Sequence, residues 1–209
     1  GVIGRACVAA LMAVLKQVEE IRIYDINQEA AQKYCQELSE TYGVRVVAVE
    51  SVEAAVRGAD VINVATAGAV SPEIHDEWLK EGVLLTLPAS AALSLDTMKS
   101  SRIVVDNWKM YEAYAQELRG LPGGYAANLS GICGYLMDLV ESGEIPQKDI
   151  VNLGDVIAGK QECRRNDRER VIFIMDGMPI EDLAWGYTVY ENAKKMGLGT
   201  KLNLWEKTR

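Results

Sequence analysis

The chain has 209 residues, of which 49% are hydrophobic and 25% charged, the composition of an ordinary globular protein. Its formal net charge of −8 at pH 7 excludes a general nucleic-acid surface and an anionic membrane as partners. The four cysteines form no C-x-x-C pair and no apolar run reaches about 18 residues, so we expect a cytoplasmic protein with reduced thiols, no metal site and no membrane span.

Short β-branched runs alternate with helical stretches through the first half of the chain. Residues 1–4 have the character of the end of a buried strand. Further strands are expected at 21–25, 44–49, 60–66, 82–88 and 102–106, and helices at 6–18, 27–42 and 51–59. Asn27 and Ser51 are candidate N-caps of two of these helices. This alternation predicts an α/β fold of the Rossmann type, with a doubly wound parallel sheet.

The second half is richer in helices, which are expected at 108–119, 130–142, 148–159 and 179–196, with one late strand at 171–176. We therefore predict a dinucleotide-binding domain over residues 1–145. Residues 146–209 are predicted to be a C-terminal extension that completes the sheet and returns towards another domain.

The opening stretch GVIGRACVAALMAVL is a candidate phosphate-binding turn. The best match to G-x-G-x-x-G/A starts at Gly4 and has Ala6 where the middle glycine lets the backbone approach a pyrophosphate. A methyl group there weakens the expected contact. Arg5 either pairs with a phosphate oxygen or is simply solvated.

An acidic residue is expected about 20 positions later, at the end of the next strand, to bind the adenosine ribose. Asp25 lies 21 positions after Gly4, at the end of the predicted strand 21–25. A negative charge there favours NAD over NADP. The alternative is that Asp25 only caps the following helix.

Several segments together resemble the ornithine cyclodeaminase/mu-crystallin family: the GVIG opening, IYD, VRGADVINVATAG, VVDNW, LGDVIAGK and GLGTKL. The resemblance covers nearly the whole chain and leans towards the amino acid and opine-type dehydrogenases. It implies a Rossmann domain that binds NAD(H) or NADP(H), an assembly into a homodimer or larger oligomer, and a substrate and dimerisation domain that would precede this sequence and is missing from it.

The resemblance places the cofactor site at Gly4, Arg5, Ala6, Asp25 and the loop Ala65, Thr66, Ala67 and Gly68. In cyclodeaminase-like members a catalytic aspartate follows the fifth strand, and its position here falls at or near Ala91. Asp96 lies too far along the chain to replace it. The catalytic acid is therefore unidentified, and ornithine cyclodeamination is disfavoured.

Two functions remain open. The first is an NAD-dependent oxidoreductase that transfers a hydride to or from the Cα of an amino acid or imino acid. The second is a catalytically silent ligand-binding or accessory subunit, for example of an amine oxidase, that retains the Rossmann shell.

Overall fold

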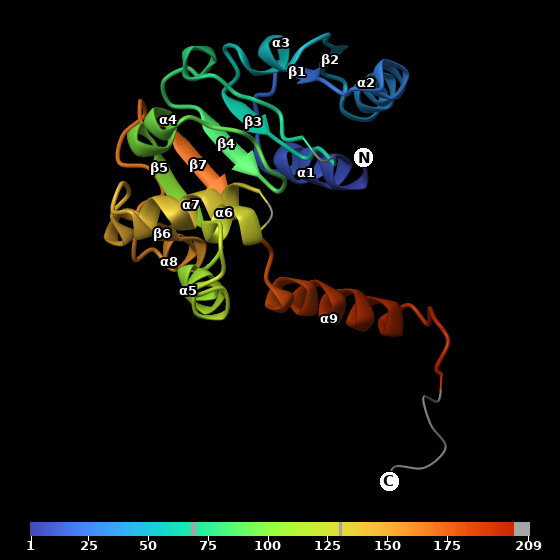
Figure 1. Cartoon of the computed structure of the whole chain (residues 1–209). Coiled ribbons are helices and arrows are strands. Elements are labelled where there is room, and N and C mark those ends of the chain that lie inside the picture. The colour runs from blue at the N-terminus through green and yellow to red at the C-terminus, as the bar shows by residue number, and fades with distance from the viewer. Residues whose placement is uncertain (68–69, 130, 203–209) are drawn as a thin grey trace. The chain divides into compact units, whose positions relative to one another are not determined.

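A computed structural model describes residues 1–67, 70–129 and 131–202 (Figure 1). The chain divides into two compact units, Gly1–Asp176 and Gly177–Arg209. Over its described residues, up to 202, the second unit contains one long helix, α9 (Pro179–Lys195), and the described strands all belong to the first unit.

The first unit alternates strands and helices along the chain. Its strands are β1 (Glu20–Ile23), β2 (Arg45–Ala48), β3 (Val61–Asn63), β4 (Leu84–Leu87), β5 (Arg102–Val105), β6 (Val151–Asn152) and β7 (Val171–Ile174). Its α-helices are α1 (Val2–Val14), α2 (Gln28–Tyr42), α3 (Val52–Val56), α4 (Leu95–Ser100), α5 (Trp108–Glu117), α6 (Gly124–Asn128), α7 (Ile132–Glu141) and α8 (Leu153–Ile157), and short 3-10 helices span Asp76–Trp78 and Gln147–Asp149.

All the strand pairs are parallel, which confirms the predicted α/β class. The strands form two sheets, one of order β1-β2 and one of order β3-β4-β7-β5-β6. Strand β7 comes from the end of the first unit and lies between β4 and β5, so the late segment completes the middle of the larger sheet.

The prediction that residues 1–4 end a buried strand is wrong. Helix α1 begins at Val2, and the side chains of Val2 and Ile3 are exposed. The described strands form two sheets, and the opening residues belong to neither.

Side chains of the central strands alternate between the two faces of the larger sheet, and both faces are covered. On one face Leu85, Ile103 and Ile172 pack with α4, α5 and α7 in the main core. On the other face Val104 and Val171 pack with Val151 and with side chains of α8.

Two predicted caps are confirmed. The Asn27 side chain accepts the Ala30 N–H at 3.0 Å at the start of α2, and the Ser51 hydroxyl accepts the Ala54 N–H at 3.0 Å at the start of α3. These caps fix where each helix begins after the preceding strand.

The single helix predicted over 148–159 is wrong. Residues Val151 and Asn152 form β6, paired with Val104 and Val105, and divide the segment into a 3-10 helix and α8. Val151 is buried in the sheet, so tertiary packing overrides the local helical pattern.

None of the helices within the described ranges has the length and apolarity to cross a membrane.

Candidate functional site

The candidate site is the carboxyl edge of the larger sheet. Since β3, β4, β7 and β5 are parallel neighbours, the segments that follow them meet at this edge. Ligands of open α/β sheets bind there, outside the carboxyl ends of the strands.

Helix α1 starts beside this edge. Gly1 is its N-cap residue and no side chain of the described residues caps its first turn. A Cβ added at Gly4 would lie 3.7 Å from the Cβ of Ala65, just past the end of β3, so the start of α1 packs close to the loop after β3. The first-turn N–H groups and the helix dipole make this end of α1 suitable for a phosphate group.

The expected strand-to-helix turn at Gly4–Ala9 is not a turn, because Gly4, Arg5 and Ala6 all lie inside α1. The Arg5 guanidinium pairs with Glu37 and lies 4.2 Å from the centre of the Tyr34 ring. Arg5 therefore connects α1 to α2 while its side chain stays 47% exposed, and a contact between Arg5 and a phosphate oxygen stays a prediction.

Asp25 follows β1, as predicted. Its Oδ1 accepts the Asn27 N–H at 2.9 Å, and its backbone carbonyl accepts the Gln28 side-chain amide at 3.0 Å. Asn27, not Asp25, caps α2. The second carboxylate oxygen has no hydrogen bond among the described residues and keeps its full acceptor capacity.

The loop after β3 contributes Ala65, Thr66 and Ala67, of which Thr66 and Ala67 are exposed. The backbone of Val64 holds the base of this loop, donating to Thr86 and accepting from Ala89, each at 3.0 Å. The predicted site residue Gly68 lies outside the described residues.

The segment after β4, residues 88–91, reads Pro-Ala-Ser-Ala and contains no acidic residue. Ser90 accepts the Ile132 N–H at 3.2 Å. A Cβ at Gly131 would lie 1.7 Å from the Ser90 hydroxyl, and Gly131 has a φ of 79°, so only glycine fits against this loop. The position expected for the catalytic aspartate, Ala91, is buried.

Sequence reasoning missed two aspartates at the same edge. Asp106 follows β5 and is buried, and Asp176 follows β7 and is exposed. An Asp106 oxygen accepts the Asp176 backbone N–H at 3.0 Å, so the two strand ends are joined. The signal was available, since each ends a buried β-branched run as Asp25 ends IRIYD.

The Asp176 carboxylate accepts hydrogen bonds from side chains of α5 and α7. The Cys133 thiol donates to its Oδ1 at 3.7 Å, and a hydrogen bond to Asp176 raises the pKa of the Tyr114 phenol to about 12. Burial raises the pKa of the Cys133 thiol to about 12, and it also raises the pKa of Tyr111, whose hydroxyl lies 3.7 Å from the Cys133 sulfur. Both tyrosines and the thiol are therefore neutral donors or acceptors at pH 7.

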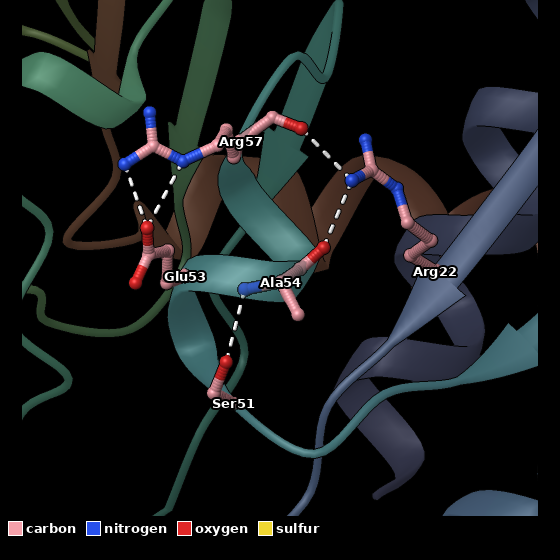
Figure 2. A pocket seen from close by; sticks show the side chains of 5 residues that line it. All are labelled: Arg22, Ser51, Glu53, Ala54 and Arg57. Atoms are coloured by element: carbon pink, nitrogen blue, oxygen red, sulfur yellow. Dashed lines mark hydrogen bonds and ion pairs between the residues drawn. The ribbon is translucent and has the colours of Figure 1, made fainter.

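A separate pocket of about 400 Å³ is lined by Arg22, Ser51, Glu53, Ala54 and Arg57 (Figure 2). Arg22 donates to the carbonyls of Ala54 and Arg57, each at 2.8 Å, and Arg57 pairs with Glu53 at 2.6 Å. These charges are engaged with one another and with the end of α3. These contacts connect β1 to α3, and the polar groups that make them are already engaged and are poorly placed to bind a ligand.

Within the described residues, no group of histidine, cysteine and acidic side chains is arranged to hold a metal ion. The four cysteines are free thiols.

Comparison with known proteins places these features in context. The model of the ornithine cyclodeaminase/mu-crystallin family matches residues 1–197. An alanine dehydrogenase of Archaeoglobus fulgidus is 30% identical over 194 residues, which are 88% of this chain and 52% of that protein. The chain thus spans about half the length of the curated relatives it matches.

Solved structures give the same picture. The Δ(1)-pyrroline-2-carboxylate reductase of Thermococcus litoralis, in complex with NADH and L-proline, has a TM-score of 0.75 at 27% identity, over 97% of this chain and 58% of that one. An archaeal alanine dehydrogenase dimer with bound NAD has a TM-score of 0.71 at 24% identity, over 98% and 58%, and supports the fold.

Proposed function

This chain belongs to the ornithine cyclodeaminase/mu-crystallin family, and from that premise we propose that it is the cofactor-binding part of an NAD-dependent oxidoreductase acting on an amino acid or imino acid. The observation that carries the proposal is the packing of the start of α1 against the loop after β3, at the carboxyl edge of a parallel sheet, with Asp25 at the end of β1. When bound, the nicotinamide cofactor would supply or accept a hydride at the substrate Cα.

The glycines that would approach the pyrophosphate are Gly1 and Gly4. Their G-x-x-G spacing fits the last two glycines of the dinucleotide fingerprint, in which the middle one lets the backbone approach phosphate and the last allows close packing of helix on strand. A Cβ built on Gly4 would lie in ordinary van der Waals contact with the Ala65 Cβ, at 3.7 Å, so Gly4 faces the loop after β3 at packing distance. In this register Ala6 lies in the helix and is not the middle position, so its methyl group does not weaken the site.

Asp25 would bind the adenosine ribose hydroxyls with its second oxygen, while Oδ1 is held by the Asn27 N–H. A carboxylate at this point repels the additional phosphate of NADP, so the proposed cofactor is NAD. Ala65, Thr66 and Ala67, with Gly68 after them, would line the cofactor beyond the pyrophosphate.

We assign this role to residues 1–145, with β6 and β7 completing the sheet from the following segment. We further propose a cytoplasmic protein that acts as a homodimer or larger oligomer. The acid-free segment 88–91 is the observation that favours the second candidate, a catalytically silent accessory subunit.

Steady-state assays of the full-length protein test the oxidoreductase proposal. NADH oxidation is followed by the loss of the near-ultraviolet absorbance that the reduced nicotinamide has and the oxidised form lacks, with Δ(1)-pyrroline-2-carboxylate or with pyruvate plus ammonium as substrate. We expect turnover with at least one of them, and faster turnover with NADH than with NADPH. Binding of NADH without any turnover would favour the silent subunit.

A further inference from the structure

The register between β4 and β7 places Asp176 beside residues 88–91, the segment after β4 that contains no acidic residue. Leu87 pairs with Ile174, and the Met175 N–H donates to the Leu87 carbonyl at 3.3 Å. Continuing this register places Asp176 level with Ala89, in the middle of the acid-free segment 88–91. A carboxylate absent from the end of β4 is thus present at the end of its neighbour.

Asp176 is both exposed and held in place, which is what a ligand-binding carboxylate requires. Its backbone N–H is fixed by buried Asp106, and its side chain accepts hydrogen bonds from Tyr114 and Cys133. These donors come from α5 and α7, which are anchored in the main core through Tyr111, Leu136 and Met137. The carboxylate is therefore oriented by rigid elements and still open to the edge where ligands bind.

We propose that Asp176 is the catalytic carboxylate of this chain, which binds the protonated nitrogen of an imino acid or amino acid substrate. Tyr114 and Cys133 are positioning residues that orient it. The assignment rests on the proposed function, since it requires a nicotinamide cofactor at the same edge.

The step is balanced by one hydride and one proton. Reduction of an imine adds a hydride to the carbon of the C=N bond, and the π electron pair moves to nitrogen, which already carries a proton taken from solvent. The imino acid becomes an amino acid and the cofactor leaves oxidised. Asp176 accepts the N–H hydrogen bond and keeps the imine nitrogen protonated, and this protonation makes the carbon electrophilic towards hydride.

The test compares three variants of the full-length protein. Asp176→Asn keeps the size and the acceptor for Tyr114 but removes the charge, and Asp176→Glu keeps the charge at a shifted position. Asp167→Asn is the matched control, because Asp167 is an exposed aspartate at the opposite edge, where the Gly82 N–H binds the Arg168 carbonyl just before β4 and β7 begin.

Four quantities are measured: kcat with Δ(1)-pyrroline-2-carboxylate and with pyruvate plus ammonium, the calorimetric Kd for NADH, the calorimetric Kd for L-proline, and the thermal midpoint. For Asp176→Asn we expect kcat to fall about 100-fold or more. L-Proline affinity should fall about tenfold, while the NADH Kd stays within about threefold of the parent. The kcat and the L-proline affinity of Asp176→Glu should lie between those of the parent and those of Asp176→Asn. Asp167→Asn should match the parent in all four quantities.

Retention of kcat within about threefold in Asp176→Asn overturns the assignment. So does a parent protein that binds NADH but reduces none of these substrates, a result that leaves cofactor binding intact. Failure of the parent to bind NADH overturns the proposed function itself. If the NADH affinity, the thermal midpoint and kcat all fall together in Asp176→Asn, Asp176 has a structural role, and this result also overturns the proposal.

Discussion

The buried carboxylate of Asp106 accepts the backbone N–H of Asp176 at 3.0 Å and joins the carboxyl ends of β5 and β7. It also accepts the Asn107 N–H at 3.0 Å, at the point where the chain enters α5. One charged side chain thus sets the position of two segments that border the candidate site. Asp176 is exposed, but its backbone position is determined from inside the core.

Asp106→Ala should therefore destabilise the protein. A hydrogen bond to a charged group contributes about 1.5–3 kcal/mol, and the substitution leaves the Asp176 and Asn107 donors without this acceptor. We expect the free energy of unfolding to fall by about 3 kcal/mol in urea titrations. Asp167→Ala, at an exposed aspartate, should change it by less than about 0.5 kcal/mol. Equal stabilities of the two variants would show that Asp106 does not anchor the edge.

Asp25→Ala should weaken NADH binding about tenfold, because the ribose hydroxyls lose a charged acceptor. The preference for NADH over NADPH should narrow as well, since the repulsion of the additional phosphate disappears. Fluorescence titration with each nucleotide measures both effects. Glu29→Ala, which removes an exposed charge in the first turn of α2, should leave the preference unchanged. A parent-like NADH affinity in Asp25→Ala would refute the ribose assignment.

Gly131→Ala should be more damaging than Gly143→Ala, although both glycines have nearly the same φ, 79° and 78°. The space around a Cβ at Gly143 is open, so backbone strain of about 1–2 kcal/mol is the only cost. At Gly131 the new Cβ also collides with the Ser90 hydroxyl, which adds about 1–3 kcal/mol.

Urea unfolding of the two single variants and of Gly131→Ala combined with Ser90→Gly separates these causes. The double variant should recover part of the loss, since it removes the colliding atom. If Gly131→Ala is no less stable than Gly143→Ala, the loop after β4 does not approach Gly131 as described.

Alkaline pH should destabilise the fold through Cys133. Burial raises the pKa of its thiol from 9.0 to about 12. Between pH 9 and pH 12 the unfolded thiol releases its proton while the folded thiol keeps it, so the unfolded state binds fewer protons and the free energy of unfolding falls as pH rises. Below pH 9 this contribution is constant.

Urea titrations at closely spaced pH values give the slope of the unfolding free energy with pH. In Cys133→Ala the slope above pH 9 should be smaller than in the parent. Cys7→Ala, on the partly exposed helix α1, should retain the parent slope. Identical slopes for the parent and for Cys133→Ala would contradict a raised pKa of the buried Cys133 thiol.

The parallel α/β class could be predicted from the sequence, because strands buried on both faces and helices with Asn27 and Ser51 caps have strong local signals. The start of α1 could not, since valine and isoleucine next to glycine favour a strand by local propensity. Only the packing of the helix start against Ala65 distinguishes the two. Strand β6 was missed for a different reason: its two residues are too few for a periodic pattern.

The candidate site was predicted in part. Asp25 was found from its spacing after Gly4, and the loop after β3 was found from the family resemblance. The cofactor roles of both stay predictions. Asp176 depends on the order β4-β7-β5, in which a late strand enters the middle of the sheet. The sequence shows that Asp176 ends a buried run, but a neighbour relation between residues 87 and 174 has no local signature, so its position beside the segment after β4 becomes visible only in the folded chain.

The central claim is that the start of α1, the end of β1 and the loop after β3 bind NADH, and calorimetric titration of the protein with NADH tests it most directly. The account predicts saturable one-to-one binding with a Kd below about 1 mM, corresponding to about −4.1 kcal/mol or better. No detectable binding at millimolar NADH would contradict it.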